Sequence, residues 1–212
     1  MAYNIEILFK RYPELSCVKN EILEAISIIR DAFKNGNRLY ICGNGGSAAD
    51  AEHIVGELMK GFLMKRELPT ELINKFEAEF GEEGKSMAIN LQQGLPAIAL
   101  TSHPALSTAF NNDVDPSLTF AQQLFSLAKS GDVLLAITTS GNSDNILKAL
   151  KVAKVLGVNT ITLTGKDGGK SKELSECTII VPSNETYMIQ ELHLPIYHAL
   201  CADLEESFYG KN

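Results

Sequence analysis

The chain lacks several features that mark particular classes of protein. It has no tryptophan and no block of basic residues, and its formal net charge is −7 over 212 residues. This balance argues against nucleic acid as the main partner, although small anions need only a local positive potential. No apolar run reaches the roughly 18–20 residues of a membrane span, and the first residues lack the basic and apolar regions of a signal peptide. We therefore expect a cytoplasmic protein with no membrane partner.

Cysteine is scarce, with four residues spread along the chain and no C-x-x-C pair. Cys42, Cys177 and Cys201 lie in apolar runs, which favours buried, reduced thiols. The composition, 45% hydrophobic and 21% charged, is ordinary for a globular protein. Since the length suffices for one domain with a sizeable core, we expect a single domain over residues 1–212.

Short apolar runs alternate with segments of helical periodicity along most of the chain. The runs at 39–42, 95–101, 132–137, 159–163 and 177–181 have the length of buried strands. Helical patterns follow at 48–58, 104–112, 116–130, 144–156 and 184–208. This alternation predicts an α/β fold of three layers, with helices on both faces of a doubly wound, five-stranded parallel sheet. Ligands bind such sheets outside the carboxyl ends of the strands.

Two helical regions lie outside this alternation. Residues 1–36 form an N-terminal helical region with a break near Pro13. We expect its apolar stripe to pack outside the sheet core, for example on a partner subunit. Residues 63–94 form a charged helical insertion, with helices at 70–80 and 85–92 separated by Gly81-Glu82-Glu83-Gly84. A solvated helical hairpin is favoured over a lid on a ligand site.

The first predicted strand runs into Gly43-Asn44-Gly45-Gly46-Ser47, a glycine-rich turn that opens a helix. Glycines let the backbone approach a ligand closely, and the N–H groups and dipole of a helix start favour an anion. The turn differs from G-x-G-x-x-G and lacks the lysine of a P-loop, so we expect no nucleotide cofactor. His53 and Glu57 follow on one face of this helix. Alone, such a pair is more often a surface pair than a site.

A second turn, from Thr138 to Ser143, follows the third predicted strand and carries four hydroxyl groups. A helix cap needs only one side chain, so the surplus favours a phosphate monoester held by neutral donors. Because the carboxyl ends of parallel strands meet at one edge of a sheet, both turns face the same crevice.

The last predicted helix carries three further polar side chains. Gln190 and His198 are about two turns apart and lean toward one edge. His193 lies on another side, and we expect it to be structural or interfacial. Pro195 removes one backbone hydrogen bond and predicts a kink just before His198.

Four blocks of sequence resemble one known family in order and spacing: GNGGSAADAEH, TTSGNS, ITLTGKDGG and IQELHLPIYH. Together they resemble the sugar isomerase (SIS) domain, and in particular bacterial phosphoheptose isomerase, over roughly residues 35–206. The resemblance implies a flavodoxin-like fold and a homotetramer with sites at subunit interfaces. It also implies an aldose–ketose isomerase that converts sedoheptulose 7-phosphate to D-glycero-D-manno-heptose 7-phosphate, the first step of nucleotide-activated heptose biosynthesis.

The resemblance implies roles for individual positions. The substrate-binding residues would be Asn44, Gly45, Gly46, Glu57, Asn112, Asp113, Thr138, Thr139, Ser140, Ser143 and Gln190. The ligands of one zinc ion per subunit would be His53, Glu57, Gln190 and His198. Glu57 and His198 would form the catalytic acid/base pair. The insertion and Pro195 depart from the family pattern.

Such an isomerisation moves a proton between two carbons through an enediol(ate). We expect Glu57 to move the carbon proton and His198 the oxygen proton, while zinc polarises the carbonyl. Glu57 cannot be a tight ligand and a free base at once, so either the metal is loosely held or the two residues exchange roles. Two other functions stay open: an isomerase of another phosphosugar, and a non-enzymatic SIS-domain protein that binds the replication initiator. The presence of both acid/base residues favours an enzyme.

Overall fold

A five-stranded, all-parallel sheet forms the centre of the computed structural model, which describes residues 5–210. The strand order is β2-β1-β3-β4-β5, so the order reverses at β1, between β2 and β3. The strands are β1 (Leu39–Gly43), β2 (Ala97–Ala99), β3 (Val133–Ile137), β4 (Asn159–Thr164) and β5 (Cys177–Ile180). The predicted doubly wound sheet and its flavodoxin-like strand order are confirmed.

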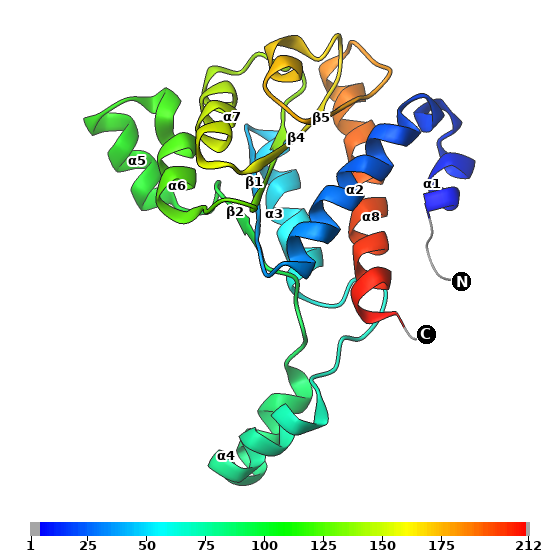
Figure 1. Ribbon diagram of the computed structural model, residues 1–212, viewed down its shortest axis with the longest axis vertical. Helices are drawn as coiled ribbons and strands as arrows, with labels where there is room; N and C mark the ends of the chain where they lie inside the picture. The colour runs from blue at the N-terminus through cyan, green and yellow to red at the C-terminus, as the bar shows by residue number, and fades with distance from the viewer. Residues whose placement is uncertain (1–4, 211–212) are drawn as a thin grey trace.

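Helices cover both faces of the sheet (Figure 1). On one face lie α2 (Lys19–Lys34), α3 (Gly46–Met59) and α8 (Thr186–Tyr209); on the other lie α6 (Thr119–Leu127) and α7 (Asp144–Leu156). Alternate residues of β1 enter the two cores: Leu39 and Ile41 pack with α2, α3 and α8, while Tyr40 and Cys42 pack with α6 and α7. Since both faces of each strand are covered, the strands read as continuous apolar runs.

The N-terminal region packs on the sheet of its own chain. α1 (Ile5–Arg11) ends before Pro13, which opens a 3₁₀ helix (Pro13–Val18), so the predicted break is confirmed. Residues 1–4 of this region lie outside the described residues. Ile22, Ile26 and Ile29 of α2 are buried in the main core with the strands and α8. The expectation that this stripe packs outside the sheet core is therefore wrong, because α2 is itself one of the covering helices.

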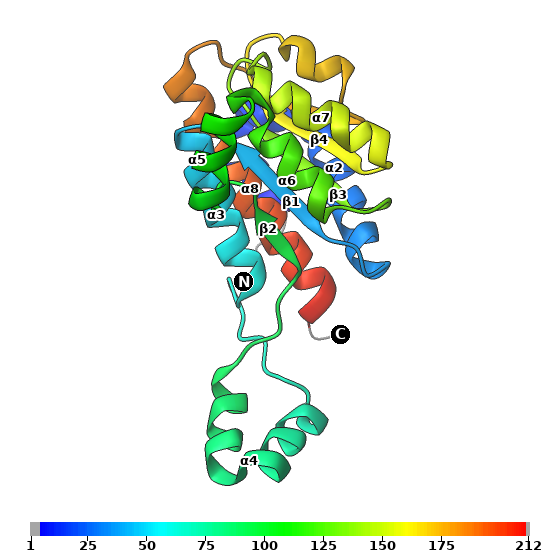
Figure 2. The ribbon, with the colours of Figure 1, turned by 90° about the vertical axis from the view of Figure 1, so that its left-hand side faces the viewer.

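The insertion is a helical hairpin that hangs from the body of the molecule (Figures 1 and 2). Its helical segment α4 (Thr70–Asn90) bends at Gly81, where φ is 60° and ψ is −144°. The predicted separation of two helices by residues 81–84 is confirmed, and the helical conformation is interrupted at Gly81. The hairpin lies beyond the carboxyl end of α3, whereas the glycine-rich turn opens the other end of that helix. It therefore does not cover the glycine-rich turn of its own chain, and its helices extend away from the body.

The remaining elements follow the predicted order, with bounds that differ from the predicted ones by at most a few residues. They include α5 (Pro104–Asp113) and 3₁₀ turns at Pro116–Leu118 and Gly169–Glu173. α8 continues through Pro195 without interruption, so the predicted kink does not break the helix. Cys42, Cys177 and Cys201 are buried free thiols, as predicted. Within residues 5–210, no helix combines the length and apolarity that crossing a membrane would require.

Candidate active site

The turn after β1 brings the amide of Gln190 against the start of α3. Gly45 has φ 57° and ψ −120°, a conformation that favours glycine. A Cβ atom on Gly46 would lie 2.6 Å from Nε2 of Gln190. The absence of a side chain at Gly46 therefore makes room for the side chain of Gln190 from α8. Gln190 and the residues of the glycine-rich turn, which the sequence predicted to share a site, lie together.

A pocket of about 270 Å³ lies beside this turn, at the carboxyl end of β3. The N-termini of α3, α7 and α8 all meet it, which favours an anion. Among the described residues, those that line the pocket include no lysine or arginine. They are Asn44, Gly45, Gly46, Ser47, Ile137, Thr138, Thr139, Ser143, Thr186 and Gln190. Neutral donors and helix dipoles thus form a site suited to a phosphate group.

The hydroxyl of Ser143 is not used to cap α7. Ser143 is the N-cap residue, but its side chain makes no capping hydrogen bond. Its Oγ lies 3.4 Å from Oγ1 of Thr138, at the wall of the pocket. The Oγ of Ser140 instead accepts a hydrogen bond from the N–H of Asn142 at 3.2 Å, and Ser140 is not part of the lining. The alternative that these hydroxyls only cap a helix therefore does not account for Ser143.

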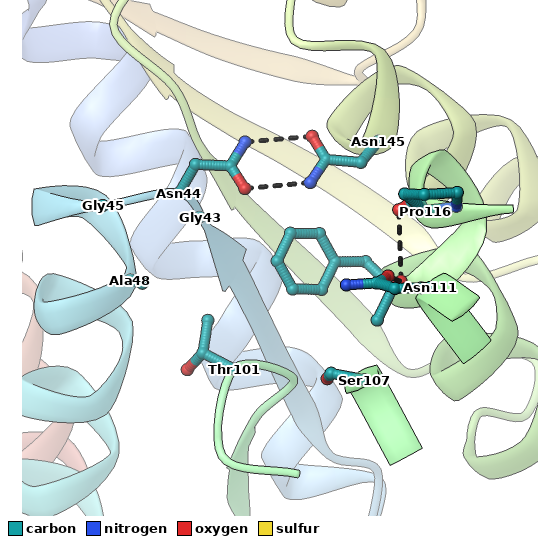
Figure 3. A pocket seen from close by; sticks show the side chains of 11 residues that line it. Gly43, Asn44, Gly45, Ala48, Thr101, Ser107, Asn111, Pro116 and Asn145 are labelled. Atoms are coloured by element: carbon teal, nitrogen blue, oxygen red, sulfur yellow. Dashed lines mark hydrogen bonds between the residues drawn. The ribbon is translucent and has the colours of Figure 1, made fainter. Parts of the chain in front are cut away.

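A second pocket, of about 280 Å³, adjoins the first and shares Asn44 and Gly45 with it (Figure 3). The side-chain amides of Asn44 and Asn145 exchange two hydrogen bonds of 2.9 Å each between the two pockets. The second pocket is lined by hydroxyl and amide groups and one aromatic ring, from Thr101, Ser107, Asn111, Thr119, Phe120 and Asn145, with Gly43, Ala48 and Pro116. Such a mixture suits a polyhydroxylated ligand.

The predicted pair Asn112 and Asp113 lies outside both pockets. Nδ2 of Asn112 donates to Oδ1 of Asp113 at 2.9 Å, and both residues are exposed at the end of α5. Their neighbour Asn111 lines the second pocket and accepts a hydrogen bond from Oγ1 of Thr119 at 2.5 Å. Which asparagine of α5 faces the pocket depends on where the helix begins and how it is rotated. The sequence does not determine this to within one residue.

His53, Glu57 and His198 form a cluster near the carboxyl end of α3. Nε2 of His53 lies 3.5 Å from Oε1 of Glu57, and the rings of His53 and His198 are 5.0 Å apart between centroids. Oε2 of Glu57 accepts a hydrogen bond from Nζ of Lys60 at 2.8 Å. Burial lowers the pKa of His198, and the neighbouring His53 lowers it further. His198 is therefore a neutral imidazole at neutral pH, which can accept or deliver a proton.

Tyr197 and Asp50, which sequence reasoning did not identify, hold His53 in place. The hydroxyl of Tyr197 donates to Oδ1 of Asp50 at 3.1 Å and lies 3.1 Å from Nδ1 of His53. Burial, with the nearby carboxyl of Asp50, raises the pKa of Tyr197, so the hydroxyl keeps its proton. Because that proton goes to Asp50, the oxygen accepts from Nδ1–H of His53. Only the fold reveals this contact, since Asp50 and Tyr197 are far apart in sequence.

The donor groups of this cluster have the chemistry of zinc ligands. Nε2 of His53 faces a carboxylate oxygen of Glu57, and Nε2 of His198 is buried with no hydrogen-bond partner within residues 5–210. Both arrangements suit a proton or a metal ion. Gln190, however, points to Gly46. Within the described part of the chain, no group of three or more His, Cys, Asp or Glu residues is placed so as to hold a metal ion. Zinc therefore stays a prediction.

Comparisons with known proteins identify the family to which the chain is similar. Two models, both described as SIS domain, match residues 14–108 and 105–202. The phosphoheptose isomerase of Nitratiruptor sp. is 42% identical over 187 residues, which cover 88% of this chain and 86% of the relative. That of Helicobacter pylori is 36% identical over 198 residues, covering 93% and 90%.

Two solved structures share the fold across nearly the whole chain. The phosphoheptose isomerase of Neisseria gonorrhoeae has a TM-score of 0.74 and 29% identity, and that of Francisella tularensis has a TM-score of 0.73 and 30% identity. In both cases the match covers 95% of this chain and 94% of the solved one.

Proposed function

The chain belongs to the phosphoheptose isomerase family of SIS-domain phosphosugar isomerases, and we propose that it converts sedoheptulose 7-phosphate to D-glycero-D-manno-heptose 7-phosphate. One observation carries the proposal: α3 has an anion pocket at its N-terminus and an acid/base cluster near its carboxyl end. A ligand that lies along this helix meets both. The reaction would be the first step of nucleotide-activated heptose biosynthesis. It only moves protons within the sugar phosphate, so it needs no nucleotide cofactor.

The distance along α3 favours a long phosphosugar. Glu57 follows Gly46 by eleven residues, so their Cα atoms are separated by about 16 Å along the helix axis. Side chains on a helix lean toward its N-terminus, which brings the carboxylate of Glu57 back toward the pocket. A seven-carbon chain with a terminal phosphate can extend between these groups, whereas a triose phosphate cannot. This length argument favours a long phosphosugar over a triose phosphate.

The reaction follows from two proton transfers. In the open-chain ketose, Glu57 removes a proton from C1, beside the C2 carbonyl, and an enediol(ate) forms. His198 supplies a proton to the oxygen on C2 and withdraws one from the oxygen on C1. The proton on Glu57 exchanges with solvent while the enediol(ate) is bound, and Glu57 then delivers a proton to C2, which leaves an aldehyde at C1. No atoms are gained or lost, and neither residue changes its net protonation over the cycle.

We keep zinc as part of this proposal. When bound, it would polarise the carbonyl and stabilise the developing oxyanion. His53, Glu57 and His198 would hold it, together with Gln190 once its amide turns away from Gly46, and Tyr197 would fix the tautomer of His53. Dialysis against a chelator, followed by metal analysis and assay, tests this point. Loss of activity that zinc restores is expected, and full activity in metal-free protein would rule zinc out.

A homotetramer with sites at subunit interfaces is the proposed assembly. Tyr187, Met188 and Leu194 on α8 are 57%, 43% and 41% exposed beside the residues of the site. The side chain of His53 is also 43% exposed. A neighbouring subunit over this face would bury apolar area and exclude water from the reacting groups. Light scattering measures the assembly directly, and a monomer at assay concentration would contradict it.

A panel of ketose phosphates tests the function. Wild-type protein is expected to produce an aldose phosphate from sedoheptulose 7-phosphate, and Glu57→Gln and His198→Ala are each expected to abolish turnover while remaining folded. Turnover of a different phosphosugar alone would redirect the assignment within the isomerases. Inactivity on the whole panel, together with capture of the replication initiator, would support the non-enzymatic alternative.

A further inference from the structure

Two charged side chains without exposed surface form an ion pair where the insertion joins the body. Nε of Arg66 lies 2.8 Å from Oε1 of Glu205, and both side chains are 0% exposed. The carboxylate of Glu205 also accepts hydrogen bonds of 2.7 Å from the backbone N–H groups of Phe62 and Leu63. Three donors therefore satisfy the buried carboxylate, and they tie the first residues of the insertion to α8.

The guanidinium of Arg66 continues from this pair to the end of α3. Nη1 donates to the carbonyl oxygen of Leu58 at 2.6 Å, and Nη2 donates to the carbonyl oxygen of Glu57 at 3.1 Å. These carbonyls belong to the last turn of the helix, whose C=O groups have no partner within it. A cation at this end also complements the helix dipole. The face of Tyr209 covers the guanidinium, 4.8 Å from its ring centroid.

The two ends of the insertion meet around the backbone of Arg66. The carbonyl oxygen of Arg66 accepts a hydrogen bond of 2.8 Å from the N–H of Gln93, and Oε1 of Gln92 accepts one of 2.9 Å from the N–H of Gly61. These hydrogen bonds hold together the backbone of the neck of the insertion, which we define as residues 61–67 and 92–93. The guanidinium of Arg66 therefore connects the neck of the insertion to α8, through Glu205, and to the last turn of α3.

A purely stabilising role does not explain this arrangement. Burying an ion pair costs desolvation energy, and apolar residues of similar size often serve stability as well or better. Unlike an apolar side chain, a planar guanidinium can donate hydrogen bonds to several acceptors at once and so fix their relative positions. Two of those acceptors are the carbonyl groups of Glu57 and Leu58 in the last turn of α3, and the Leu58 oxygen also accepts a hydrogen bond of 2.9 Å from the N–H of Leu95.

We propose that Arg66 is a positioning residue for Glu57. It holds the last turn of α3 so that the carboxylate of Glu57 faces the reacting carbon, and Glu205 holds Arg66. The inference rests on the proposed function, in which Glu57 moves the carbon proton. The insertion is then part of the catalytic apparatus through its neck, although its helices lie away from the site.

Arg66→Lys tests the proposal, because lysine keeps the charge beside Glu205 but cannot reach both carbonyls of α3. The matched control is Arg30→Lys: Arg30 of α2 pairs with Asp203 of α8 at 3.9 Å, two residues from Glu205. For each variant, kcat, KM and the rate of deuterium uptake at the reacting carbon in D2O are measured on folded protein. Thermal unfolding is recorded in parallel.

For Arg66→Lys, kcat and the deuterium uptake are expected to fall together, by between about tenfold and a hundredfold. KM is expected to stay unchanged, because the anion pocket lies at the other end of α3. Arg30→Lys is expected to keep all three values. A lowered melting temperature with unchanged kcat in Arg66→Lys would overturn the proposal, since that is the result of a stabilising role alone.

If Arg66→Lys fails to fold, Glu205→Gln replaces it. This variant removes the charge that anchors the guanidinium of Arg66, so the guanidinium is expected to shift away from the carbonyl groups of α3. A fall in kcat at constant KM is again expected. Unchanged kcat would again overturn the proposal. An inactive wild type would instead contradict the proposed function, so the two failures are distinguishable.

Discussion

Nδ1 of His53 lies 3.1 Å from the hydroxyl oxygen of Tyr197, across the interface between α3 and α8. Because Tyr197 gives its own proton to Asp50, this contact leaves the proton of His53 on Nδ1 and presents Nε2 to Glu57. The tautomer of a predicted zinc ligand is thus fixed by two residues that lie within the family-like blocks of sequence but to which sequence reasoning assigned no role.

Removing this hydroxyl is expected to lower turnover. Tyr197→Phe keeps the ring in the core but frees His53 to rotate, so kcat is expected to fall by about tenfold or more. Tyr187→Phe is the control, since Tyr187 is 57% exposed on the same helix. Steady-state kinetics and zinc affinity are the measurements. Equal kcat and equal zinc affinity in the two variants would show that the Tyr197 contact has no role in the site.

Ser143→Ala is expected to weaken substrate binding without destabilising the fold. Its hydroxyl faces the anion pocket and makes no capping bond. Loss of one hydrogen bond to a charged phosphate costs about 1.5–3 kcal/mol, which corresponds to a rise in KM of at least about tenfold. The contrasting variant is Asp115→Ala, which removes a side chain that does cap a helical turn at 2.8 Å. A lower melting temperature with normal KM in Ser143→Ala would show that the serine is only structural.

Alanine substitutions at two glycines of α3 distinguish the effect of side-chain packing from the effect of helix propensity. Gly46→Ala places a Cβ atom 2.6 Å from Nε2 of Gln190, so displacement of that amide and a higher KM are expected. Gly56→Ala meets nothing within 4 Å. It is expected to stabilise the protein by up to about 1 kcal/mol through helix propensity, with unchanged kinetics. Denaturant unfolding and kinetics of both variants check the contrast, which would fail if both behaved alike.

Much of the fold could be read from the sequence because the strands are buried on both faces. Leu39 to Cys42 and Val133 to Ile137 read as unbroken apolar runs, and their alternation with helical patterns leaves few topologies. The error about α2 has a simple cause. An apolar stripe shows that a helix is covered, but it does not say whether a sheet or another subunit covers it.

The site was predicted less completely than the fold. Thr138, Thr139 and Ser143 line the pocket, because turns after neighbouring parallel strands must meet. Thr186 lines it too, yet a threonine at a helix start has no distinguishing signal in sequence. The same holds for Arg66 and Glu205, which lie 139 residues apart and read as ordinary surface charges until the fold brings them together.

Acidification is expected to destabilise the protein through His193, which was predicted to be structural or interfacial and is fully buried. Burial lowers the pKa of His193 to about 4, below the ordinary value of 6.5. Between these values the unfolded chain binds a proton that the folded chain does not, so the free energy of unfolding falls as pH falls. The histidine contributes a loss of about 2 kcal/mol between pH 7 and pH 5.

Denaturant unfolding of wild type and His193→Leu at these two pH values measures this contribution. The variant is expected to lose less stability than wild type on acidification. Equal losses would mean that His193 takes up its proton in the folded state as readily as in the unfolded chain.

The central claim is that Glu57 moves a carbon proton of sedoheptulose 7-phosphate. Incubation of the protein with this ketose in D2O, followed by NMR of the product, tests it most directly. We predict an aldose 7-phosphate that carries deuterium at C2, and neither product nor exchange with Glu57→Gln. Product formation by Glu57→Gln at the wild-type rate, or no product and no exchange with the wild type, would contradict the account.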